Sequence, residues 1–62
     1  MKESDFFLNV GDKFRLNTTA GLKYSGIVLK KTSTGVYFRD KFSNHVFLNF
    51  GQISMLQSVS FP

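Results

Sequence analysis

The 62-residue sequence contains no cysteine and a single histidine, His45. Disulfides and structural zinc, the usual supports of domains this small, are therefore excluded, and the fold must depend on dense packing or on self-association. The same lack excludes a thiol nucleophile and a metal centre. Only four carboxylates are present, three of them before residue 13, so no general acid–base pair is expected. We predict that the chain is not an enzyme and carries no cofactor.

Long apolar runs are also missing from the sequence. The run Phe6–Leu8 is too short, and too close to the acidic Glu3 and Asp5, to be a signal peptide. No stretch approaches the ~20 apolar residues that cross a bilayer. Together with the absence of cysteine, which fits a reducing compartment, this predicts a soluble cytoplasmic protein.

Aromatic residues and cations are abundant. Eight phenylalanines and two tyrosines provide more apolar surface than one small barrel can bury, which favours a subunit interface or an aromatic binding surface. The net charge of +4 is unevenly distributed, because residues 1–12 hold Lys2 against three carboxylates, whereas residues 13–62 hold seven lysines and arginines against Asp40 alone. A basic domain behind an acidic leader favours a polyanionic partner.

Five segments have the residue pattern of β-strands. They are Lys13–Thr18, Leu22–Lys31, Val36–Asp40, His45–Phe50, and a fifth that begins at Gln52 and ends at Ser58 or Val59. Residues 1–12 are interpreted as an N-terminal leader or short helix, and residues 13–62 as a single domain. Strict alternation turns Lys13 and Arg15 towards solvent. Gly26, in the interior of the second strand, is expected to mark a corner at which that strand bends.

The number and length of these strands predict an all-β fold. Five short strands in about fifty residues, one of them bent at a glycine, are typical of a small, strongly bent barrel of SH3-like or Sm-like type. An OB barrel, somewhat undersized for its class, is the alternative. The N-terminal leader must dock on this barrel, because about two helical turns do not persist alone.

The glycines of the second strand carry a family resemblance. The run Gly21–Gly26, in which a turn glycine leads to a second glycine at the bend, resembles the signature of Sm-like proteins. The spacing from Gly26 to Asp40 is similar to that of the bacterial Hfq branch, and the strand pair hinged at Gly51 is similar to the second Sm motif. The resemblance covers residues 13–59. It implies a bent five-stranded sheet whose last two strands pair with neighbouring subunits to close a ring that binds single-stranded RNA.

The resemblance carries over one functional residue and leaves others without a counterpart. Lys23 lies in the turn whose counterpart lines one ring face in the Hfq branch. Lys31-Thr32 and Thr34 stand where the family has an aromatic–aspartate pair and a base-stacking residue. Asn49-Phe50-Gly51 stands where the Hfq branch has its uridine-contacting run. A Sm-like scaffold with a different RNA pocket, or with none, therefore stays an alternative.

The candidate nucleic-acid-binding residues are Lys23, Lys30, Lys31, Tyr37, Arg39 and Lys41. The lysines and the arginine are expected to attract phosphates, and Tyr37, beside Arg39 on one strand face, to stack on a base. We predict a homo-oligomeric barrel that binds nucleic acid, with RNA favoured and with little sequence readout. The alternative is an SH3-like protein-interaction module or accessory factor that docks through its phenylalanine-rich surface.

Overall fold

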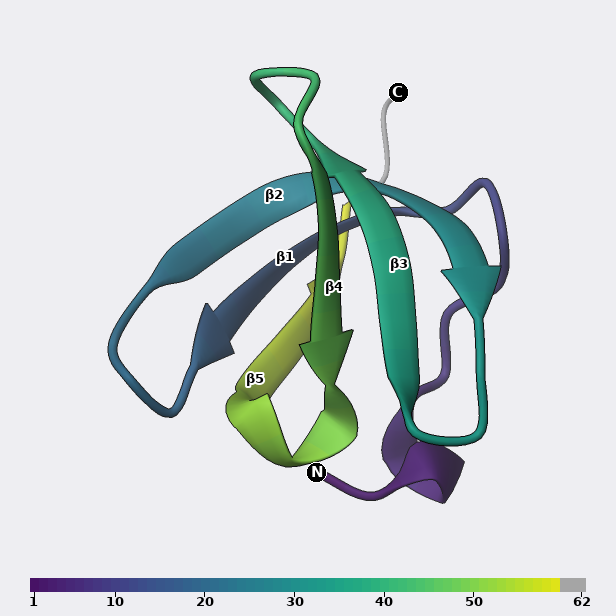
Figure 1. Ribbon diagram of the computed structural model, residues 1–62, viewed down its shortest axis with the longest axis vertical. Coiled ribbons are helices and arrows are strands. Elements are labelled where there is room, and N and C mark those ends of the chain that lie inside the picture. The colour runs from purple at the N-terminus through teal and green to yellow at the C-terminus, as the bar shows by residue number, and fades with distance from the viewer. Residues whose placement is uncertain (60–62) are drawn as a thin grey trace.

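The computed structural model describes residues 1–59, so the last three residues of the predicted domain lie outside the described part. Five antiparallel strands form one sheet in the order β4-β3-β2-β1-β5 (Figure 1). The elements are η1 (Glu3–Asp5), β1 (Lys13–Thr18), β2 (Lys23–Lys31), β3 (Gly35–Asp40), β4 (His45–Asn49), η2 (Phe50–Gln52) and β5 (Ile53–Ser58), where η denotes a 3-10 turn. The all-β prediction is confirmed, and every strand begins and ends within one residue of its expected position.

Strand β2 connects the two halves of the sheet. Its residues 23–27 pair with β1 and its residues 26–31 pair with β3, so the two pairings overlap only at Gly26 and Ile27. Figure 1 shows β2 curving over one end of the molecule. A Cβ atom at Gly26 would overlap the carbonyl oxygen of Arg39, so the close approach of β3 requires glycine there. The predicted corner at Gly26 is therefore confirmed.

A β-bulge at Leu29 reverses the alternation within β2. Val28 lies opposite Phe38, whereas Lys30 lies opposite Tyr37, so one extra residue has entered β2. Because residues directly opposite one another in a sheet point to the same side, Lys30 joins Tyr37 on the outer face. Lys31 consequently turns to the inner side.

The hydrophobic core lies on the inner side of the sheet. Its most deeply buried side chains are Phe14, Leu16, Val28, Val36, Phe38 and Ile53. The rings of Phe14 and Phe38 meet edge to face with their centroids 4.9 Å apart. The leader adds Phe6 and Leu8 to this core, with the Phe6 ring 5.5 Å from that of Phe50. The leader is thus docked on the sheet by its apolar residues.

The sheet does not close into a barrel. In the described part of the chain, β4 pairs only with β3, and β5 pairs only with β1, which leaves one edge of each strand without a partner. The predicted five-stranded barrel is thus open. The physical reason for the open barrel is η2. This three-residue turn joins β4 directly to β5 and changes the chain direction, so that β5 runs at an angle to β4 (Figure 1). Gly51 within η2 has neither a positive φ nor a close neighbour.

Residues 1–59 include no helix that is long and apolar enough to span a membrane.

Candidate nucleic-acid interface

The outer face of the sheet brings cations from separate strands together. Across β1 and β2, Lys13 lies opposite Ile27 and Arg15 lies opposite Ser25. Across β2 and β3, Ile27 lies opposite Arg39. Because opposed residues share a face, the side chains of β1 and β3 flank the same stretch of β2 from its two sides. The pairing register therefore places Lys13, Arg15 and Arg39 on one surface.

Two adjoining hollows of about 450 Å³ each lie in this surface. The first, which we call the cationic hollow, includes Lys13, Arg15, Arg39, Asp40 and Lys41 in its lining. The second, which we call the amide hollow, is lined by Arg15, Leu16, Asn17, Lys23, Tyr24, Ser25, Lys41, Met55 and Gln57. Arg15, Ser25 and Lys41 belong to both. The two hollows therefore form one continuous depression with cations along it.

Asp40, the acidic residue in this lining, is engaged by its own turn. Its Oδ1 atom accepts hydrogen bonds from the backbone N–H groups of Phe42 and Asn44, both at 2.9 Å. Within residues 1–59, neither Arg15 nor Arg39 forms an ion pair with this carboxylate or with any other. Arg15 and Arg39 are therefore not paired with that acid.

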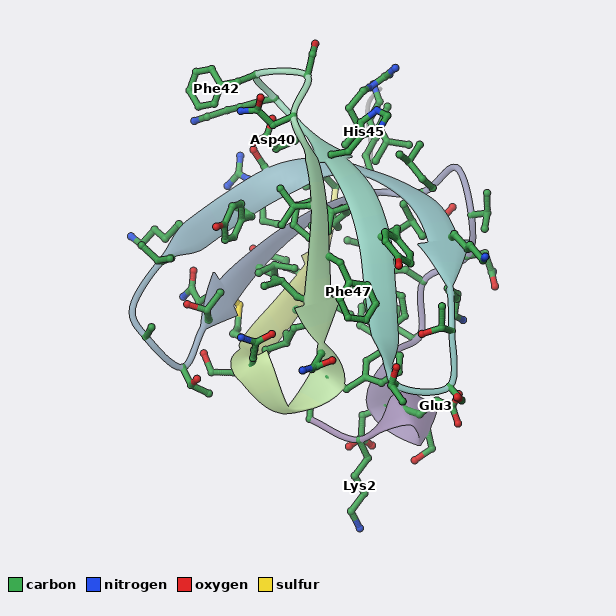
Figure 2. All side chains as sticks on the ribbon, in the orientation of Figure 1. Lys2, Glu3, Asp40, Phe42, His45 and Phe47 are labelled. Carbon is green, nitrogen blue, oxygen red and sulfur yellow. The ribbon has the colours of Figure 1, made fainter. Side chains whose placement is uncertain are left out.

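Exposed aromatic rings adjoin the cations. Tyr37 of β3 lies opposite Phe47 of β4, with the ring centroids 4.6 Å apart, and the two side chains are 43% and 37% exposed. Lys30 lies opposite Tyr37 on the other side. Phe42, 72% exposed, projects from the turn between β3 and β4, with the Lys41 ammonium 5.3 Å from its ring centroid. Figure 2 shows Phe42 at the tip of that turn and Phe47 on the outside of β4.

The structure divides the predicted binding residues into three groups. Lys23, Arg39 and Lys41 lie around the two hollows. Lys30 and Tyr37 oppose one another across β2 and β3, farther along the same outer face. Lys31 lies apart on the inner side of the sheet, with its Nζ atom 5.4 Å from the centroid of the Phe6 ring.

The loop between β2 and β3 is closed by its own hydroxyl group. Thr32 Oγ1 accepts a hydrogen bond from the N–H of Gly35 at 3.0 Å and donates to the Gly35 carbonyl oxygen at 3.1 Å. Gly35 also packs closely on β4, where an added Cβ would overlap the carbonyl oxygen of Leu48. The loop is thus a self-contained turn, and the hydroxyl of Thr32 is used inside it.

Sequence reasoning missed Lys13, Arg15 and the amide side chains of Asn17 and Gln57 as lining residues. The alternation of β1 did turn Lys13 and Arg15 outwards, and that was the available signal. Their proximity to Arg39 depends on the register of β1 and β3 against β2, which a single sequence does not reveal.

No family model, curated protein or solved structure matches this chain. The resemblance to Sm-like proteins therefore stays a prediction that depends on the glycine spacing around β2.

Proposed function

We propose that this protein binds single-stranded nucleic acid, in the first place RNA, along the outer face of its sheet. The observation that carries the proposal is the gathering of cations from β1, β2 and the end of β3 around two adjoining hollows. The acid between them, Asp40, is held in its own turn. A phosphate backbone lying in this depression would neutralise the cations and release its counterions, which favours binding.

The exposed rings favour unpaired bases over a duplex. Tyr37 and Phe47 present ring surface beside Arg39 and Lys30, and successive bases of a single strand stack on such rings. In a duplex the bases are already stacked and cannot use them. The outer face in the described part is built from strands and short turns, so it offers no helix to enter a major groove.

We propose further that the protein is a homo-oligomer. Strands β4 and β5 each have one edge without a partner in residues 1–59, and such edges are normally covered in a stable protein. Pairing of β4 in one copy with β5 in the next would cover both edges. The Sm-like resemblance implies the same arrangement, in which the outer faces of successive copies would form a longer basic surface.

Salt dependence tests the proposed binding. Fluorescence anisotropy with a labelled single-stranded oligoribonucleotide is measured over a range of salt concentrations. With roughly four phosphate contacts, affinity is expected to fall about 50-fold between about 50 and 200 mM salt. Affinity that is independent of salt would contradict the electrostatic basis of the proposal. A duplex of the same sequence is the control and is expected to bind more weakly.

The solution mass tests the proposed oligomer. Light scattering is expected to give a multiple of the chain mass of 7.1 kDa. A monomer that retains no oligonucleotide would instead favour the alternative, a protein-interaction module that docks through exposed apolar side chains such as Phe7 and Val10.

A further inference from the structure

The amide hollow contains hydrogen-bonding groups that the fold itself does not use. The side-chain amides of Asn17 and Gln57 and the hydroxyl of Ser25 form no hydrogen bond within residues 1–59. Asn17 is engaged through its backbone, where the carbonyl oxygen accepts a hydrogen bond from the Ser54 hydroxyl at 3.1 Å. Asn17 and Ser25 are nevertheless half-buried, so these polar groups line a surface that is partly shielded from water. They are available to a ligand.

The strands hold these groups in fixed positions around the hollow. Asn17 lies between Lys23 of β2 and Met55 of β5, and Gln57 lies opposite Arg15. Met55 of β5, 39% exposed, adds an apolar side chain on the same face. The volume of about 450 Å³ is within the range of small-ligand sites. An apolar side chain beside a few convergent polar groups suits a flat heterocycle that has hydrogen-bonding edges.

The lining offers more hydrogen-bond donors than acceptors. Arg15 and Lys23 can only donate, the amides and the hydroxyl can both donate and accept, and no carboxylate from residues 1–59 lines this hollow. Base edges rich in acceptors, such as O6 and N7 of guanine or the carbonyl oxygens of uracil, match this lining. The exocyclic amino group of cytosine needs an acceptor, and the acceptor best suited to it, a carboxylate, is missing from the lining that residues 1–59 provide.

We propose that the amide hollow is a base-recognition site that discriminates against cytosine and favours a base with a carbonyl oxygen where cytosine bears an amino group. This inference rests on the proposed function, because the strand must first be held on the outer face. Arg15 and Lys41, which line both hollows, connect the two sites. Phosphates bound at these cations bring the neighbouring base to Asn17 and Gln57. The protein then reads sequence at one position in addition to binding the backbone.

Homopolymers that differ in a single functional group test the inference. Oligouridine and oligocytidine of equal length carry the same backbone charge and differ chiefly in a carbonyl against an amino group at ring position 4. Anisotropy titrations at one salt concentration are expected to show about tenfold tighter binding of oligouridine.

Variants locate the selectivity. Asn17→Ala combined with Gln57→Ala is expected to bring the uridine-to-cytidine affinity ratio close to one. The slope of affinity against salt is expected to stay unchanged, because the amides carry no charge. The control is Asn9→Ala, an exposed asparagine of the leader, which is expected to keep the ratio. Circular dichroism spectra verify that each variant is folded.

The possible failures are distinguishable. Equal affinity of the wild-type protein for oligouridine and oligocytidine would overturn the base-recognition site and leave the proposed function standing, and this readout needs no variant to fold. A ratio that persists in the double variant would also overturn it, because the selectivity would then lie elsewhere. Absence of binding to every oligonucleotide would overturn the proposed function as well.

Discussion

The inner and outer faces of the sheet are built from alternate residues of the same strands, and they differ in where their partners lie. On the inner face, Phe14, Leu16 and Phe38 are at most 2% exposed and contact one another across the core. On the outer face, Arg15 and Arg39 line an open hollow and form no ion pair within residues 1–59. The inner residues find their packing partners inside the chain, whereas these two arginines find no partner for their charges there. Stability and binding should therefore be separable in this protein.

Electrostatics support that separation. Cations that share one hollow repel one another, so their clustering opposes folding rather than favouring it. Substitution on the outer face should accordingly change binding with little loss of stability. Substitution on the inner face should lower stability without removing a group that contacts the nucleic acid. The predictions below compare matched changes on this basis.

The largest expected effect is a difference in the free energy of unfolding between Phe→Ala in the core and Phe→Ala at an exposed position. Phe38→Ala removes a ring that is 0% exposed, and it should lower the free energy of unfolding by about 3–5 kcal/mol, enough to unfold much of a domain this small. Phe42→Ala removes a ring that is 72% exposed and should change the same quantity by less than about 0.5 kcal/mol. Urea denaturation followed by circular dichroism measures both. Similar losses in the two variants would contradict the division into faces.

The second prediction concerns the bend that lets one strand serve both halves of the sheet. Gly26→Ala places a Cβ against the carbonyl oxygen of Arg39, so β2 and β3 must separate, and stability should fall by about 1–3 kcal/mol. Gly51→Ala introduces the same methyl group into open space at ordinary φ, and it should be neutral or slightly stabilising. Thermal unfolding of both variants provides the measurement. A neutral Gly26→Ala would show that the strands can separate freely at the corner.

The third prediction moves to the outer face. Arg15→Gln combined with Arg39→Gln should weaken RNA binding roughly tenfold and reduce the salt slope by about 1.4, or about 0.7 for each lost phosphate contact with a single strand. Stability should change by less than about 0.5 kcal/mol per site. Lys31→Gln removes one charge on the other side of the sheet, over the Phe6 ring, and should weaken binding less. Equal losses from Lys31 and from either arginine would indicate binding by net charge without a defined face.

The positions of the strands could be predicted because their signals are local. Alternation along β1 and the glycine inside β2 depend on a few neighbouring residues, and both led to the observed structure. The bulge at Leu29 could not be predicted, because the sequence around it is apolar on both faces and conceals the reversal of alternation. That reversal is what turned Lys31 away from the predicted surface and onto Phe6.

Non-local geometry limits the rest of the sequence prediction. Whether β4 meets β5 depends on the direction in which η2 turns the chain, and the residues Phe50–Gln52 do not encode that direction in any recognisable pattern. The inclusion of Arg15 in the cationic hollow likewise requires the register of β1 against both β2 and β5. Charge composition thus predicted that the domain has a basic surface. The pairing register of the strands determines which residues lie on that surface.

The smallest predicted effect lies in the turn that carries Lys41 and Phe42. Ser43 has a φ of 66°, a conformation that glycine adopts more readily than other residues, while its N–H donates to the Asp40 carbonyl oxygen at 3.0 Å. Ser43→Gly relieves the strain and keeps that backbone hydrogen bond. The free energy of unfolding should rise by at most about 1 kcal/mol, because glycine also gives the unfolded chain more freedom. Urea denaturation measures the gain.

The Ser43→Gly variant also tests, through its RNA affinity, whether stability and binding are separable. Ser43 lines the cationic hollow, yet its known contact is the backbone hydrogen bond of the turn. Its replacement by glycine should therefore leave RNA affinity and its salt slope within error of the wild-type values. A loss of affinity in a variant of higher stability would mean that the hydroxyl or the rigidity of the turn contributes to binding. The binding groups of the outer face would then include more than its cations and aromatic rings.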